Sequence, residues 1–300
     1  MANNIQKRIN AERFQHSTTR TDAIREVEKY LNGRTLVTFF TSFDHPVEID
    51  DNDCDMLQSI LQHIDLSGGL ALMINSPGGD GLAAERVVNA CRAYSGTKDY
   101  WAIVPGRAKS AATIISIGAS KIFMGAPSEL GPVDPQIIRR ESGVWRYFSA
   151  YSLVSGYEKL FNNAIKAKGN LEPFMQQLQK YDVREINKYR DLIKLSEDIA
   201  VKILRSGTMN GQTDASIRKK IGIFLDPRKG TITHGRPINA AEAGGCGLDV
   251  EIMDVHSPQW VAIYELYART EMYASSPVAA KAMESRDECF YVPPPRMDER

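Results

Sequence analysis

Two short segments of this sequence combine residue types that can carry out acyl transfer. In the first, Ser-Pro-Gly-Gly-Asp at 76–80, two adjacent glycines directly follow the apolar run Leu-Ala-Leu-Met-Ile-Asn at 70–75. Glycines permit a positive φ and carry no side chain, so their backbone N–H groups can point at an incoming oxygen and stabilise the charge that develops on it. Gly78 and Gly79 are therefore candidate oxyanion-hole residues, although an ordinary strand-to-helix turn has the same glycine content.

The second segment, Gly-Arg-Ala-Lys-Ser-Ala-Ala at 106–112, places a serine at the predicted start of a helix. A helix N-terminus favours an adjacent anion, so Ser110 can serve as a nucleophile if a base reaches its hydroxyl. The alternative is that Ser110 only caps the helix, a role for which serine is strongly preferred. The presence of both segments in one chain favours the catalytic interpretation.

The residues around these segments predict alternating strands and helices. Apolar and β-branched runs predict strands at 35–43, 70–75, 99–106 and 121–125. Helical patterns follow the second and third of these strands, at 82–94 and 107–120. The order strand, glycine turn, helix, strand, helix is typical of a βαβ architecture with a parallel sheet.

The flanking regions are predicted from caps, charges and glycines. Thr21 and Asp22 open a helical pattern that stops at Gly33. The alternating aspartates of 51–55 resemble a calcium loop, but Met56 stands where such a loop needs a glycine. Acidic residues are also favoured in the first turn of a helix, so we interpret this run as a helix N-terminus.

The second half of the chain predicts a helical insertion and a tail. From about 156 to 206 the sequence is charged and helical, which indicates an inserted helical arm at about 140–220. The predicted organisation is an N-terminal helical segment at 1–34, a catalytic domain at 35–255 that carries the insertion, and a C-terminal helix and tail at 256–300. We expect the tail to be ordered only where a partner chain or domain holds it.

The composition excludes several classes of protein. Among 300 residues, 37 basic and 37 acidic side chains give no net charge, which excludes a globally basic nucleic-acid binder. The four cysteines form no CxxC pair and the histidines no HxxxH pair, so neither a metal site nor another cofactor is predicted. The N-terminus lacks the apolar core of a signal peptide, and the longest weakly polar stretch, 111–119, is too short to span a membrane. We expect a cytoplasmic protein without a transmembrane segment.

Three stretches of the sequence carry a resemblance to a known family. They are INSPGGDGLAAERVVNACR, PGRAKSAATIISIGASKIFMGAPSELGPVDPQI and THGRPINAAEAGGCGLDV. Together they resemble the serine dehydrogenase proteinase family of the Clp protease/crotonase superfamily, with a more distant likeness to signal peptide peptidase A. The resemblance covers roughly residues 20–270. It implies a Clp/crotonase-type ββα spiral, a nucleophile at Ser110, and oxyanion donors at Gly78 and Gly79, with Ala111 as a further donor.

The general base is where the sequence departs from the Clp protease pattern. That pattern has a histidine after the strand that follows the nucleophile's helix, and an aspartate before the last Ala-Glu-Ala helix. Here the first position offers Asp134 and the second offers His234. Ser110, His234 and Asp134 can still form a triad, because chain order is free. The alternative is that both residues belong to ordinary turns.

A serine–lysine dyad is the competing assignment of the base. Signal peptide peptidase A uses a lysine, and Lys159 or Lys166 lies at a comparable interval after Ser110. Each lysine is also typical of a solvated helix face. Lys109 adjoins Ser110 in sequence, but on a helix its side chain points elsewhere.

These observations predict an ATP-independent type of serine peptidase that forms an acyl-enzyme on Ser110. The resemblance implies a homo-oligomer, trimer-based or ring-shaped, that takes a peptide or protein substrate; a partner protein that delivers substrate is compatible with it. Two alternatives stay open. One is a catalytically silent oligomeric scaffold, because the usual histidine is displaced, and the other is a crotonase relative that processes acyl-CoA.

Overall fold

A seven-stranded sheet forms the centre of the protein. The computed structural model describes residues 5–12, 16–141, 144–226 and 237–295. The strand order is β11-β10-β1-β2-β3-β5-β9, in which the five strands from β1 to β9 are parallel and β10 and β11 are antiparallel. The strands are β1 (Thr35–Thr41), β2 (Leu70–Asn75), β3 (Tyr100–Val104), β5 (Lys121–Gly125), β9 (Val250–Met253), β10 (Lys281–Glu284) and β11 (Cys289–Val292). The predicted parallel α/β architecture is confirmed.

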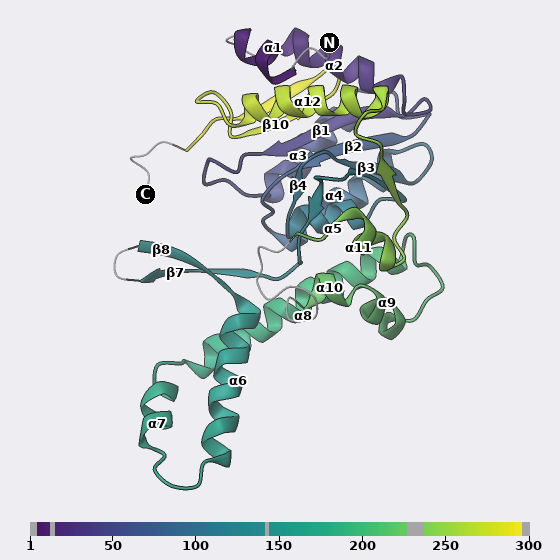
Figure 1. Cartoon of the computed structure of the whole chain (residues 1–300). Coiled ribbons are helices and arrows are strands. Elements are labelled where there is room, and N and C mark those ends of the chain that lie inside the picture. Colours follow the sequence, from purple (N-terminus) through teal and green to yellow (C-terminus); the bar gives the residue numbers. More distant parts are fainter. Residues whose placement is uncertain (1–4, 13–15, 142–143, 227–236, 296–300) are drawn as a thin grey trace.

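Helices cover both faces of this sheet (Figure 1). One face carries α3 (Asp51–Leu61), α4 (Gly81–Tyr94) and α5 (Ala111–Ile117), and the other carries α2 (Ser17–Glu28) and α12 (Pro258–Ala274), with α1 (Ile5–Ala11) beyond them. Side chains of a strand alternate between the faces. Val37 and Phe39 accordingly join the core under α4, while Leu36 and Phe40 join the core under α12. Both faces are covered, which explains why β1 and β2 are apolar or β-branched at nearly every position and fully buried.

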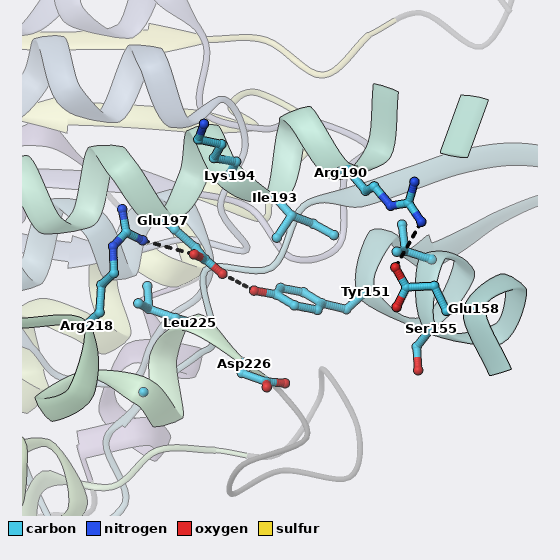
Figure 2. Close-up of a pocket in the computed structure, with 12 residues that line it drawn as sticks. Tyr151, Ser155, Glu158, Arg190, Ile193, Lys194, Glu197, Arg218, Leu225 and Asp226 are labelled. Atoms are coloured by element: carbon cyan, nitrogen blue, oxygen red, sulfur yellow. Dashed lines mark hydrogen bonds and ion pairs between the residues drawn. The ribbon is translucent and has the colours of Figure 1, made fainter. Parts of the chain in front are cut away.

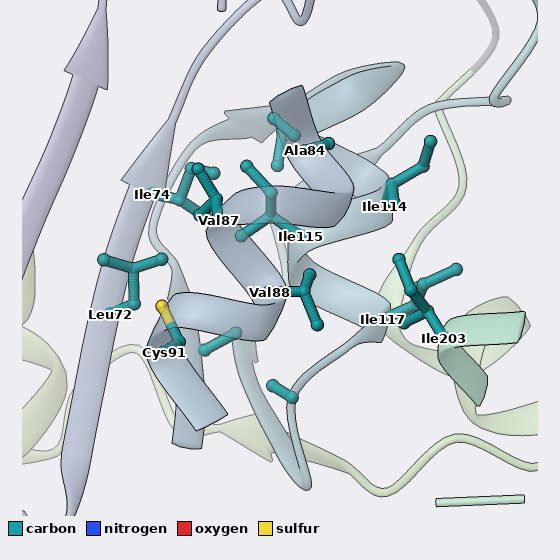
Figure 3. Close-up of a cluster of buried hydrophobic side chains, with 14 of the residues drawn as sticks. Leu72, Ile74, Ala84, Val87, Val88, Cys91, Ile114, Ile115, Ile117 and Ile203 are labelled. Carbon is teal, nitrogen blue, oxygen red and sulfur yellow. The ribbon is translucent and has the colours of Figure 1, made fainter. Parts of the chain in front are cut away.

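The core beneath α4 and α5 fixes the two helices that follow the predicted catalytic segments. Figure 3 shows Val87 and Val88 of α4 packed among Ile74 of β2 and Ile115 and Ile117 of α5. All five side chains are at most 2% exposed. Close packing of this kind leaves little freedom for the starts of α4 and α5 to move relative to each other.

A helical arm projects from the body of the protein (Figure 1). We define it as residues 150–205, which hold α6 (Ala150–Lys166), α7 (Glu172–Leu178) and α8 (Val183–Arg205). A hairpin of β7 (Gln136–Glu141) and β8 (Val144–Ser149) precedes it. The last turns of α8 return to the main core, where Ile203 and Leu204 are buried. The short helices α9 (Asp214–Lys220), α10 (Gly222–Leu225) and α11 (Ala240–Gly245) follow.

The aspartates of 51–55 belong to a helix start, as predicted. Asp50 is the N-cap of α3, its side chain accepts from the Asn52 N–H at 2.9 Å, and Asp53 completes a capping box by accepting from the Asp50 N–H. Lys281 of β10 also donates to Asp53, at 2.9 Å. The carboxylates are therefore used by the helix and by a buried ion pair.

Two predicted boundaries are wrong. The first long helix, α2, begins at Ser17 and not near Thr21, because Arg20 faces inward and pairs with buried Glu284. Residues 281–292 are not a tail: β10 and β11 extend the sheet on the far side of β1. β10 was not recognised in the sequence because it contains charged residues. These side chains have buried partners, and this pairing allows β10 to lie in the sheet.

Candidate active site

The two predicted catalytic segments lie side by side at the carboxyl ends of β2 and β3. A short strand β4 (Arg107–Ala108) continues from β3 and pairs with Ser76, which follows β2. The Ser76 N–H donates to the Arg107 carbonyl at 2.9 Å, and the Lys109 N–H donates to the Ser76 carbonyl at 3.0 Å. These two bonds join the glycine segment directly to the segment that leads into Ser110.

Gly78 packs directly against Ser110. A Cβ atom at Gly78 would lie 2.8 Å from the Ser110 Cβ, 2.6 Å from the Lys109 carbonyl oxygen and 3.2 Å from the Ala111 nitrogen. Gly78 has a φ of +107°, a region that side chains disfavour. The structure therefore requires glycine here on two grounds, backbone conformation and space, and an ordinary turn would need only the first.

Ser110 has a strained backbone and an unused side chain. Its φ of 49° and ψ of −115° are rare for a residue with a Cβ, and the Ala112 N–H closes the turn by donating to the Lys109 carbonyl at 2.9 Å. Such strain persists only where surrounding contacts enforce it, and it is common at active sites. Ser110 occupies the N-cap position of α5, but its side chain makes no capping hydrogen bond. Simple helix capping therefore does not explain this serine.

Two backbone N–H groups beside Ser110 are available as donors. In the described residues, the structure records no acceptor for the N–H of Gly79 or of Ala111. The Gly78 N–H, in contrast, donates to the Ser76 hydroxyl at 3.1 Å. Gly79 is fixed by a bridge to Ile49, which leaves no room for a side chain. Within the described residues, Gly79 and Ala111 thus have backbone N–H groups that no recorded hydrogen bond uses, and Gly78 allows the two segments to approach closely.

In the described residues, none of the three lysine side chains considered as bases forms a recorded hydrogen bond with the Ser110 side chain. Lys109 turns away and pairs with Glu129 of β6 (Glu129–Leu130), with 2.9 Å between Nζ and the carboxylate. Lys159 and Lys166 are exposed on α6 of the helical arm. In the part of the chain that the structure describes, the Ser110 hydroxyl forms no recorded hydrogen bond.

Asp134 is described by the structure and His234 is not. Asp134 is fully buried after β6, and its Oδ2 accepts from the Gln136 side-chain amide at 3.3 Å. His234 lies outside the described residues. The chain re-enters the structure at 237, where Ile238 pairs with Leu130 of β6, the strand that pairs with β4. In the sequence, Asp134 is four residues after Leu130 and His234 is four residues before Ile238.

A partly buried polar cluster at the same strand ends was not identified from the sequence. The Asn75 side chain accepts from the Arg107 N–H at 2.8 Å and donates to Glu271 of α12 at 2.6 Å. Burial raises the pKa of Glu271, and the nearby Arg107 charge acts in the opposite direction. Asn75 adjoins the glycine segment and could have been suspected. Glu271 could not, because it is 196 residues away in the chain.

A cavity of about 430 Å³ lies at the base of the helical arm (Figure 2). The Tyr151 hydroxyl donates to Glu197 of α8, and Arg218 of α9 pairs with the same carboxylate at 3.0 Å. Burial, Glu197 and the more distant Asp134 carboxylate all raise the pKa of Tyr151. Ala150, which precedes Tyr151, donates its N–H to the Pro135 carbonyl at 2.9 Å, so this side of the cavity is joined to the segment that carries Asp134.

A mostly parallel α/β sheet with a glycine loop packed against a strained serine turn fits the ClpP-like class of proteins. Residues 12–300 match the family described as ClpP-like SDH-type serine proteinase. The chain belongs to this family, which confirms the resemblance inferred from the three sequence stretches.

The matching relatives leave the activity open. Two proteins of Methanocaldococcus jannaschii, the uncharacterized proteins MJ0137 and MJ1495, are 30% identical over 202 residues and 29% identical over 174 residues. The matches cover 67% and 53% of this chain and 57% and 53% of those proteins, so this chain spans little more than half of their length.

Two solved structures of the 1510-N membrane-bound stomatin-specific protease, one with a substrate peptide, are also similar to this chain. Their sequence identities are 15% and 13%, and their TM-scores are 0.30 and 0.29. The matches cover 54% and 77% of this chain and 84% and 98% of those chains. A likeness at this level carries no inference about substrate or membrane association. In the described parts of this chain, no helix is both long and apolar enough to cross a membrane.

Proposed function

We propose that the protein is an ATP-independent type of serine peptidase, built on a Clp/crotonase-type ββα spiral with the helical arm inserted. The observation that carries this proposal is the contact between Gly78 and Ser110, in which a strained serine with an uncommitted side chain lies beside backbone donors. Membership of a serine proteinase family supports the same reaction class.

The reaction would proceed through an ester on Ser110. As a base takes the hydroxyl proton, Oγ bonds to the substrate carbonyl carbon and the carbonyl π electrons move to the oxygen. The N–H groups of Gly79 and Ala111 stabilise this oxyanion, an effect worth about 10²–10³ in turnover for each donor in comparable sites. Collapse of the intermediate breaks the C–N bond, the base returns its proton to the leaving amine, and water then hydrolyses the ester.

For the base, we propose His234, oriented by Asp134. The His234→Ala variant is expected to lose activity almost as completely as a nucleophile variant, and Asp134→Asn to lose about 10⁴-fold, because an orienting carboxylate transfers no proton. Lys159→Ala and Lys166→Ala are expected to change kcat/KM on a peptide less than about twofold, since both lysines are exposed surface residues. Retained activity in His234→Ala with loss in either lysine variant would establish the dyad.

The silent-scaffold alternative has one observation in its favour: in the described residues, no base contacts the Ser110 hydroxyl. Catalytic contacts often tighten only when substrate binds, so this geometry is compatible with either function. The acyl-CoA alternative is tested by adding CoA thioesters and following release of free CoA. We expect no turnover beyond that of a Ser110→Ala control.

We further propose a homo-oligomer, trimer-based or ring-shaped, in which the helical arm makes contacts between subunits. Large apolar side chains of the arm are exposed at Phe161, Ile165, Leu171, Met175 and Val183. Exposed apolar groups on a projecting element are typical of interaction surfaces. Sedimentation at micromolar concentration is expected to give at least three times the 33.4 kDa of one chain. A monomeric mass would contradict this proposal.

A further inference from the structure

Arg107 presents an exposed guanidinium group close to the proposed nucleophile, three residues before Ser110. Its planar head lies over the ring of Phe43, with 3.7 Å from Cζ to the ring centroid. Stacking of this kind fixes the orientation of the guanidinium while its N–H edge stays able to donate. In the described residues, the structure records neither a carboxylate oxygen within 4.0 Å of the guanidinium nitrogens nor a hydrogen-bond acceptor for them.

The backbone of Arg107 is held by the same contacts that place Ser110. Its N–H donates to the Asn75 side-chain oxygen at 2.8 Å, and its carbonyl accepts from the Ser76 N–H at 2.9 Å. The preceding Gly106 is confined as well, because a Cβ there would lie 2.8 Å from both the Asn75 Oδ1 and the Tyr267 hydroxyl. The backbone position of Arg107 relative to Ser110 is therefore set by the fold, and the contact with Phe43 orients its side chain.

Two carboxylates belong to this region, Glu271 through its electrostatic interaction with Arg107 and Asp44 as the neighbour of Phe43 in the chain, and in the described residues neither pairs with Arg107. Glu271 accepts from the Asn75 amide at 2.6 Å, and the Arg107 charge opposes the effect of burial on the pKa of Glu271. Asp44 is exposed on the loop after β1. Negative charge therefore acts on the guanidinium group without a direct ion pair, and its N–H donors are available to another acceptor.

We propose that Arg107 binds a carboxylate of the peptide substrate, either the terminal α-carboxylate or an Asp or Glu side chain. This inference rests on the proposed peptidase function. Three extended residues span about 10 Å, so a carboxylate at Arg107 lies within about four residues of the scissile bond. A stacked guanidinium matches a carboxylate with two parallel N–H···O bonds, and a lysine would offer only a point charge.

The first test compares peptides that differ by one carboxylate. Each peptide of the series carries Glu or Gln at one position within four residues of the cleaved bond, and a second pair ends in a free acid or an amide. At one position, the acid is expected to raise kcat/KM at least about 10-fold, more than the roughly fivefold limit of an isolated surface ion pair. The position of the effect distinguishes a side-chain carboxylate from the terminal one.

Variants then assign this preference to Arg107. In Arg107→Met, the kcat/KM of the acid peptide divided by that of the amide peptide is expected to fall to about 1. Arg107→Lys should give an intermediate ratio, because lysine keeps the charge and loses the paired N–H donors of the guanidinium group. Arg25→Met is the matched control, since Arg25 is an exposed arginine that pairs only at the surface, with Asp22 on α2. It should leave the ratio unchanged. A ratio that survives in Arg107→Met, or that equals 1 in the unaltered protein, overturns the inference.

A binding measurement separates this inference from the peptidase function itself. Fluorescence anisotropy of the same labelled peptides on Ser110→Ala needs no turnover. Acid peptides are expected to bind about 10-fold more tightly than their amides, and the difference should vanish in the Ser110→Ala/Arg107→Met double variant. If the unaltered protein cleaves nothing and this difference is present, the carboxylate site stands and the peptidase proposal fails. Equal binding of acids and amides overturns the carboxylate site.

Discussion

Ser110→Ala is expected to abolish peptide hydrolysis and to leave the fold and the sedimentation mass unchanged. Removal of a triad nucleophile lowers turnover on the order of 10⁶-fold. Alanine keeps the Cβ, so it should adopt the same φ of 49° with the same strain, and no capping hydrogen bond is lost. The free energy of unfolding should therefore change by less than about 0.5 kcal/mol. Activity would be measured on a fluorogenic peptide and stability by urea titration.

A companion variant tests whether strain is stored at Ser110. Ser110→Gly should be equally inactive but at least as stable as Ser110→Ala, because glycine adopts a positive φ without the steric penalty. Hydrolysis that persists in either variant would remove Ser110 from the mechanism. A large fall in stability for Ser110→Gly would show that the serine turn is relaxed.

Gly78→Ala is expected to lower both turnover and stability. The added methyl group would lie 2.6 Å from the Lys109 carbonyl oxygen and 2.8 Å from the Ser110 Cβ, so the two segments must separate. Displacement of a nucleophile from its donors by about 1 Å can cost 10²-fold in rate, and loss of one donor costs 10²–10³-fold. We therefore expect kcat to fall about 10²–10³-fold for the folded fraction, together with a lower melting temperature.

Gly244→Ala is the matched control for Gly78→Ala. Gly244 lies in α11, and in the described residues, apart from its chain neighbours and its own helix backbone, no atom lies within 4 Å of the position that its Cβ would take. Alanine in a helix should stabilise the protein by about 0.5–1 kcal/mol without changing turnover. Equal rates for the two glycine variants would contradict the role given to the Gly78–Ser110 contact.

The sheet was predictable where burial and residue type agree. The apolar run at 70–75 and the run at 121–125 coincide with β2 and β5, and the helix at 82–94 is α4 with one more residue at its start. β10 was not predictable, because Lys281 and Glu284 are charged and only their buried partners, distant in sequence, explain why they enter the sheet. Local patterns carry no information on such long-range pairs.

The site was predictable in its residue types and not in its geometry. The glycine pair and Ser110 were identified from their positions after two strands, and the structure brings Gly78 and Ser110 into contact. The surrounding contacts impose the positive φ of Ser110, and no sequence pattern predicts it. The position of Glu271 beside Asn75 depends on how α12 packs across the sheet. The assignment of His234 as the base remains a prediction.

The central claim, that Ser110 is an activated nucleophile, is tested most directly by a fluorophosphonate probe. After incubation of the full chain with the probe, intact mass followed by peptide mapping is expected to show one adduct per chain, on Ser110, and none on Ser110→Ala. Such probes react with a serine only when its hydroxyl is activated, as a catalytic nucleophile is. An unmodified Ser110, or an adduct on a different residue, would contradict the account and favour a silent scaffold.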